Sequence, residues 1–119
     1  TRDQLLQTVI KGSPYAYIEA VVSLDTADDL KQLSFELRKM TSQTVILLGC
    51  NIDDKPMLSF ILSEDLPPTD SLNLTSLIRE AAKAIQGGGG GQPFYATAGG
   101  KKSEGLSVAL QLAVSKLKG

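Results

Sequence analysis

Residues 87–101 read Gly-Gly-Gly-Gly-Gly-Gln-Pro-Phe-Tyr-Ala-Thr-Ala-Gly-Gly-Lys, and this stretch holds seven of the eleven glycines in the chain. Five consecutive glycines lose much backbone entropy on folding, so a folded domain keeps them only for a reason. A periodic helical segment precedes the run and a strand-like segment, Pro93 to Ala98, follows it at once. A flexible linker would instead separate two self-sufficient modules. The stretch therefore favours a binding surface over a linker.

A run without side chains allows a charged partner to approach the backbone, whose N–H groups then face an anion such as a phosphate. Gly99 and Gly100 come directly before an expected helix N-terminus, which adds donors and the positive end of a helix dipole. Lys101 and Lys102 add positive charge there. P-loops and dinucleotide fingerprints turn from a strand into a helix, whereas this run closes a helix. The pattern indicates phosphate recognition outside those loops.

The remaining chain predicts a single α/β domain, a mixed sheet packed against helices, in the order α-β-α-β-β-α-β-α. Strands are expected over Tyr15 to Leu24, Thr44 to Ile52, Met57 to Leu62 and Pro93 to Ala98. Helices are expected to begin at Thr26, to cover Leu74 to Ile85 and to cover Leu106 to Leu117. Because both hairpin and crossover connections occur, parallel and antiparallel pairs should coexist.

Helix ends carry recognisable capping residues. Caps are expected at Thr26, at Asp70 or Asn73, and at Ser103. The helix after Thr26 should bury a stripe made of Leu30, Leu33, Leu37 and Met40.

Composition excludes several functions. The chain has 119 residues, 42% of them hydrophobic and 21% charged, which suits one soluble domain. It has no histidine, which removes the commonest general base and metal ligand, so we expect neither catalytic residues nor a metal site. Cys50, the one cysteine, is expected to be a buried apolar residue, and a reducing cytoplasm is the expected compartment. No apolar run approaches the roughly 20 residues that cross a bilayer.

Charge is distributed unevenly along the chain. The net charge is −1, but from Lys83 onward there are five basic residues and one acidic residue, a net charge of +4. This asymmetry fits a surface that prefers a polyanion, and it fits ordinary solvated helix charge equally well.

The chain is expected to be a piece of a longer protein. Arg2 to Ile10 has apolar residues at helical spacing, as at the end of a helix begun earlier, and no methionine precedes it. Residues 1–12 are therefore assigned to an upstream helical region and residues 13–119 to a glycine-rich globular domain.

Gly87 to Gln92 with Pro93, then Ala96, then Ala98 to Lys101, resemble the glycine-rich signature near the C-terminus of alanyl-tRNA synthetases. The resemblance extends upstream over the apolar strand, Asp-Lys turn and returning strand of Val45 to Leu62. The wider superfamily is the DHH-associated domain, which also occurs in phosphoesterases that degrade short oligonucleotides. Those enzymes typically carry Gly-Gly-Gly-His, whereas Gln92 follows the run here.

The resemblance implies a tRNA-binding C-terminal domain of an alanine–tRNA ligase, which docks the corner of tRNA(Ala) and assists aminoacylation and editing by other domains of the same chain. It implies no cofactor in this fragment, because ATP, Mg and Zn would act through those other domains. It also implies a possible homodimer through the upstream helical region and no membrane partner. Two alternatives stay open: an oligonucleotide-binding domain of a DHH-type phosphoesterase, and an assembly module that dimerises through Arg2 to Ile10.

Carried over by position, the RNA-facing surface consists of Gly88, Gly89, Gly90, Gly91, Gly99, Gly100 and Lys101. Lys102 is added for its charge. Alternation along the strand places Phe94 and Tyr95 on opposite faces, and Tyr95 is the one expected to face RNA, because its hydroxyl tolerates water.

Overall fold

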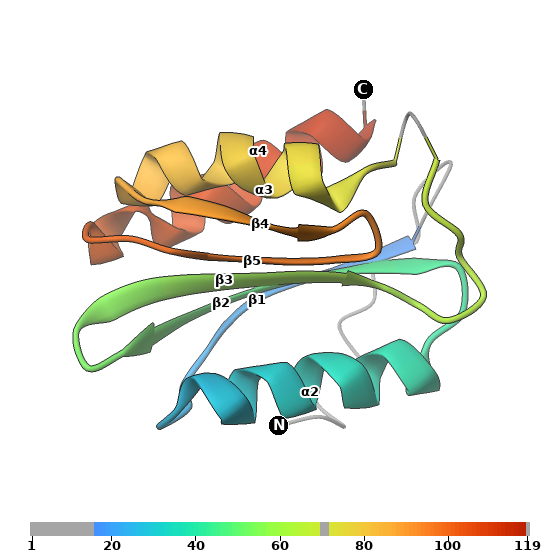
Figure 1. Ribbon diagram of the computed structural model, residues 1–119, viewed down its shortest axis with the longest axis horizontal. Coiled ribbons are helices and arrows are strands. Elements are labelled where there is room, and N and C mark those ends of the chain that lie inside the picture. The colour runs from blue at the N-terminus through green and yellow to red at the C-terminus, as the bar shows by residue number, and fades with distance from the viewer. Residues whose placement is uncertain (1–15, 70–71, 119) are drawn as a thin grey trace.

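The computed structural model describes residues 16–69 and 72–118 and shows a five-stranded sheet between helical layers (Figure 1). The strand order is β1-β2-β3-β5-β4, in which β1 is parallel to β2 and the other neighbours are antiparallel. The predicted α/β class with a mixed sheet is confirmed. The expected upstream helical region, residues 1–12, and Tyr15 lie outside the described residues.

The parallel pair is built by a crossover through a helix. The elements are β1 (Ala16–Val22), α2 (Ala27–Met40) and β2 (Thr44–Ile52). The Thr26 hydroxyl accepts a hydrogen bond from the amide of Asp29 at 3.1 Å, as the sequence predicted for this cap. The helix packs on β2 and β3.

The buried stripe of α2 is made of Leu30, Leu33, Ser34 and Leu37. Met40, expected in that stripe, is 47% exposed. It is the last residue of the helix, and the next residue, Thr41, is already extended, so no further turn holds its side chain against the sheet.

The hairpin of β2 and β3 (Lys55–Leu62) forms the centre of the fold. Asp53 and Asp54 connect the two strands with φ angles of 52° and 64°. Two left-handed residues in a two-residue loop match the twist of the flanking strands. Residues 44–50 of β2 are all buried, as its continuous apolar sequence predicted.

Asp65 fastens the end of this hairpin to the turn that follows α2. Its carboxylate accepts hydrogen bonds from the Ser42 hydroxyl, from the Gln43 amide at 2.9 Å and from the Ser63 hydroxyl at 2.9 Å. Hydrogen bonds to the charged form favour it. The pKa of Asp65 is therefore held well below its ordinary value of 3.8. The hydrogen bond from Ser42 contributes most to this lowering, followed by those from Gln43 and Ser63.

Two helices cover the other face of the sheet, α3 (Leu74–Ala82) and α4 (Leu106–Lys118) (Figure 1). The Asn73 side chain caps α3 by accepting from the amides of Thr75 at 2.9 Å and Ser76 at 3.3 Å. Asp70, the alternative cap, lies outside the described residues.

The expected cap at Ser103 is wrong. A 3₁₀ turn, η2 (Ser103–Gly105), comes before α4, and the Ser103 hydroxyl donates instead to the carbonyl of Asp54 at 3.3 Å. A cap at Ser103 would place the first helical residue at position 104, whereas α4 begins two residues later, at Leu106. The side chain of Leu117 lies outside the described part of the chain.

The glycine run is itself a strand. After α3, a short turn η1 (Lys83–Ile85) leads to Gln86, whose φ is 53°, and then to β4 (Gly88–Gln92). This strand pairs antiparallel with β5 (Tyr95–Gly99) across the turn of residues 93–94. The expectation that the glycines only end the preceding helix is therefore incomplete, and the linker alternative is excluded.

Alternate glycines of β4 meet different surroundings. A Cβ at Gly89 would overlap the carbonyl of Thr97 and the side chain of Ala98 in β5. A Cβ at Gly90 would meet nothing within 4 Å. The close approach of β4 to β5 thus depends on Gly89 but not on Gly90.

This contrast predicts opposite stabilities for two alanine variants. Gly89→Ala should lower the free energy of unfolding by about 1–3 kcal/mol, the usual cost of overpacking. Gly90→Ala should leave it unchanged or raise it by about 0.4–1 kcal/mol, because alanine reduces the entropy of the unfolded chain. Urea titrations of both variants measure the difference, and equal destabilisation would contradict the pairing of β4 with β5.

The hydrogen bonds of Asp65 predict how stability depends on pH. Its pKa is lower in the folded chain than in the unfolded chain, so the carboxylate stabilises the fold above pH 3.8, and this stabilisation is lost as pH falls below that value. Asp65→Asn should therefore lower the urea midpoint at neutral pH, and the difference from the parent chain should shrink on acidification. A difference that is constant with pH would show that the charge has no role.

Candidate nucleic-acid interface

Three glycines on the β4–β5 hairpin have open space where a side chain would stand: Gly88, Gly90 and Gly99. Gly88 pairs directly with Gly99, and Gly90 pairs with Thr97. Since residues two apart in a strand share a face, the three glycines lie on one side of the hairpin. We call this surface the glycine face.

The glycine face lies on the same side of the sheet as α2 but is not covered by it. Tyr95, two residues before Thr97 and on its face, packs its ring against Phe35 of α2. The helix itself packs on β2 and β3, so the hairpin of β4 and β5 extends beyond it (Figure 1). Backbone is therefore accessible over the glycine face.

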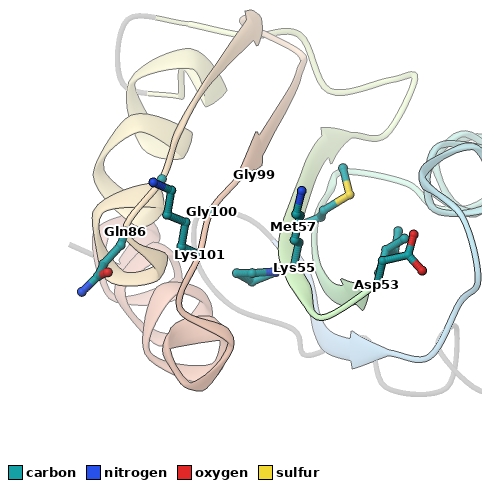
Figure 2. A pocket seen from close by; sticks show the side chains of 10 residues that line it. Asp53, Lys55, Met57, Gln86, Gly99, Gly100 and Lys101 are labelled. Carbon is teal, nitrogen blue, oxygen red and sulfur yellow. The ribbon is translucent and has the colours of Figure 1, made fainter.

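A groove of about 480 Å³ borders this face. One side comes from the β2–β3 turn and the other from the main chain around β4 and β5 (Figure 2). The lining residues are Ile52, Asp53, Lys55, Pro56, Met57, Gln86, Gly87, Gly99, Gly100 and Lys101. The Gly100 amide donates to the Pro56 carbonyl at 3.0 Å and so ties the two sides together.

Two lysines from opposite sides and one aspartate line the groove. In Figure 2, Lys55 and Asp53 come from the β2–β3 side, and Lys101 extends along the other side toward Gln86. All three charged residues are exposed. Lys102 is exposed as well but does not line the groove. The groove therefore has a positive balance in a chain of net charge −1.

Gly99 and Gly100 were expected to add main-chain donors at a helix N-terminus, but the amides of residues 100–102 are bonded within the domain. The amides of Lys101 and Lys102 both donate to the carbonyl of Ile85, at 2.8 and 2.9 Å, and the Gly100 amide is bonded as described above. The turn η2 also separates these residues from the start of α4. The predicted phosphate cradle at this helix N-terminus is therefore wrong, and any contact here depends on the lysine side chains.

The predicted separation of Phe94 and Tyr95 is confirmed. Phe94 packs against the core under α3 and α4, with the Arg38 guanidinium 4.7 Å from its ring centroid. Tyr95 packs on the opposite side, with its ring centroid 5.0 Å from that of Phe35 in an edge-to-face contact. Burial raises the pKa of the Tyr95 hydroxyl above its ordinary value.

The structure separates the expected RNA-facing residues into groups. Gly88, Gly90 and Gly99 form the glycine face, and Gly100 and Lys101 line the adjoining groove. Gly89 and Gly91 are exposed too, but a Cβ at either position would overlap β5. Tyr95 lines a smaller depression beside α2.

Seven of the ten groove residues were not among the sequence-based candidates, and Lys55 and Met57 are two of these seven. Met57 is paired with Gly99, so it lies beside the glycine face although 42 positions separate it from Gly99 in the sequence. Nothing local in the sequence signals this neighbourhood, because the register of β3 against β5 creates it.

Within residues 16–69 and 72–118, no cluster of three or more His, Cys, Asp or Glu side chains could hold a metal ion. Cys50 is buried, as predicted, and burial raises the pKa of its thiol. None of the described helices is both long and apolar enough to cross a bilayer.

Comparisons with known proteins identify the family of this chain. A family model of the DHHA1 domain matches residues 15–119. The alanine–tRNA ligases of Cytophaga hutchinsonii and Chloroflexus aurantiacus are 41% identical over 106 residues and 36% identical over 117 residues. These alignments cover 89% and 98% of this chain but 12% and 13% of the relatives, so the chain spans about an eighth of their length.

A solved structure shares the fold closely. The C-Ala domain from Aquifex aeolicus alanyl-tRNA synthetase superposes with a TM-score of 0.82 at 26% identity, covering 93% of this chain and 98% of that domain. The chain therefore belongs to the DHHA1 domain family, and within that family it is similar to domains of alanyl-tRNA synthetases.

Proposed function

We propose that this chain is a tRNA-binding domain of an alanine–tRNA ligase and that the glycine face is its RNA contact. The observation that carries the proposal is the open space at Gly88, Gly90 and Gly99. Each glycine within a strand costs about 0.5–1 kcal/mol relative to alanine. Packing within the domain does not require glycine at these three positions. We therefore attribute the three glycines to the binding of a partner that contacts the backbone directly.

Folded RNA suits such a surface. Proteins recognise it largely through shape, stacking and contacts with phosphates and 2′-hydroxyls, and a strand without side chains allows all of these at close range. The side chains of Lys101 and Lys102 extend from the end of the hairpin and supply positive charge near the glycine face. Their local field attracts phosphates although the chain as a whole is slightly acidic.

The remaining functions of the ligase are assigned to other domains. The relatives are about eight times longer than this chain, so aminoacylation and editing, with any use of ATP, Mg²⁺ or Zn²⁺, would take place elsewhere in the parent protein. We propose tRNA(Ala) as the partner and the cytoplasm, where proteins are synthesised, as the compartment. Dimerisation through residues 1–12 remains a separate proposal.

The lysines should contribute phosphate contacts. Lys101→Ala combined with Lys102→Ala should weaken tRNA binding and reduce the slope of log affinity against log salt by about 1.5, because each phosphate contact releases counterions. Filter binding of tRNA(Ala) at several salt concentrations measures both effects. Lys39→Ala combined with Lys116→Ala removes the same charge from exposed positions outside the groove and is the control.

An unchanged slope in the first variant would exclude these two lysines from the interface. The same assay distinguishes tRNA binding from the rival function, oligonucleotide binding in a DHH-type phosphoesterase. A preference for di- and trinucleotides over folded tRNA would indicate the rival function.

A side chain on the glycine face should block RNA without unfolding the domain. Gly90→Val places a branched side chain in the open space, and we expect tRNA affinity to fall by about tenfold, equivalent to 1.4 kcal/mol. The urea midpoint should stay close to that of the parent chain. Ser107→Val adds a similar side chain at an exposed position of α4 and should bind tRNA normally. Full affinity in Gly90→Val would remove the glycine face from the interface.

A further inference from the structure

We propose that the groove beside the glycine face is a subsite for one unpaired nucleotide of the bound RNA. Its base would lie against Met57, and its phosphate would lie between Lys55 and Lys101. The inference rests on the proposed function, since it names the part of the RNA that this groove accepts. We call the groove the nucleotide groove.

The apolar part of the nucleotide groove suits the face of a base. Met57 is half-buried, and Ile52 and Pro56 continue the apolar surface on the same side. A thioether is polarisable and makes favourable contacts with aromatic rings. The volume of about 480 Å³ lies within the range of small-ligand pockets, about 300–1,000 Å³.

The opposite side of the nucleotide groove is main chain. A Cβ at Gly87 would overlap the carbonyl of Gly99, and a Cβ at Gly100 would overlap the carbonyl of Ile85. Close packing of the backbone therefore requires glycine at both positions, and neither residue has a side chain that could narrow the groove. Gly99 belongs to both the groove and the glycine face. A nucleotide of an RNA strand bound on the glycine face could therefore turn into the groove without meeting a side chain at this position.

The charges complement a phosphate. Lys55 and Lys101 line the groove from its two sides, and no acidic side chain in the described part of the chain pairs with either ammonium. Asp53 is the acidic residue among those that line the groove. Lysine binds phosphate as a flexible point charge, which suits a phosphate held between two sides.

Only an unpaired nucleotide can use this arrangement. A base within a duplex is stacked on both faces and paired along its edge, whereas bases in loops can be splayed out and stacked on protein side chains. The groove should therefore distinguish loop-containing RNA from a plain duplex that carries similar charge.

The chain contains two methionines, which makes the test direct. With ¹³C-methyl methionine, Met57 reports on the nucleotide groove, and Met40, 47% exposed at the end of α2, is the internal control. Adding 5′-AMP should shift the Met57 methyl signal upfield by the ring current of the base and leave the Met40 signal unchanged. Adenosine should act more weakly, and inorganic phosphate should produce no upfield shift.

A charge variant tests the phosphate position. Lys55→Gln should weaken 5′-AMP binding about tenfold, the usual loss for a hydrogen bond to a charged group. Lys39→Gln is the matched control and should bind as the parent chain does. Equal effects of the two variants would overturn the placement of the phosphate.

Titrations with tRNA(Ala) and with an RNA duplex test the nucleotide groove separately from the proposed tRNA binding. We expect tRNA(Ala) to shift the Met57 signal and a blunt RNA duplex to leave it in place. Binding of tRNA(Ala) without a Met57 shift overturns the nucleotide groove but not the proposed function. A Met57 shift with 5′-AMP and no binding of tRNA(Ala) overturns the proposed function instead. Shifts of Met57 and Met40 together, or a duplex as effective as tRNA(Ala), also contradict the inference.

Discussion

The pairing of a glycine strand with β5 is the contact on which the interface of this domain depends. At Gly89 the backbone of β4 approaches β5 so closely that a methyl group would overlap it. At Gly88 and Gly90, on the other side of the strand, an added Cβ would meet nothing within 4 Å. One run of sequence thus serves two purposes, because alternate residues of a strand face opposite sides.

The position of α2 determines which part of the sheet remains open. The helix packs on β2 and β3, and its side of the sheet is closed there by Leu30, Leu33 and Leu37. Its contact with the hairpin of β4 and β5 includes the edge-to-face pair of Phe35 and Tyr95. Tyr95 therefore lies where the part of the sheet covered by α2 ends, next to the proposed RNA surface. Tyr95 is a candidate for base stacking, but its ring is half-buried and already packs against Phe35 within the domain.

Electrostatics in this chain are local. The acidic net charge would by itself argue against a nucleic-acid partner, yet Lys55 and Lys101 line one groove although they are 46 residues apart in the sequence. Salt screens charges beyond about 10 Å at ordinary ionic strength, so a phosphate at the groove responds to these two lysines more than to the distant acids. Asp65, whose carboxylate is held by three hydrogen-bond donors, serves the fold instead.

The sequence by itself determined the α/β class, the cap at Thr26 and the apolar strand 44–52, and it limited the cap of α3 to Asp70 or Asn73, because periodicity and capping act within a few neighbouring residues. It did not reveal β4, since glycines have no side chains and so no hydrophobic pattern. Only the tertiary structure decided that this run is a strand, because the partner β5 supplies its hydrogen bonds. The structure likewise placed Met57 beside Gly99, since the register between distant strands is set by packing of the whole sheet.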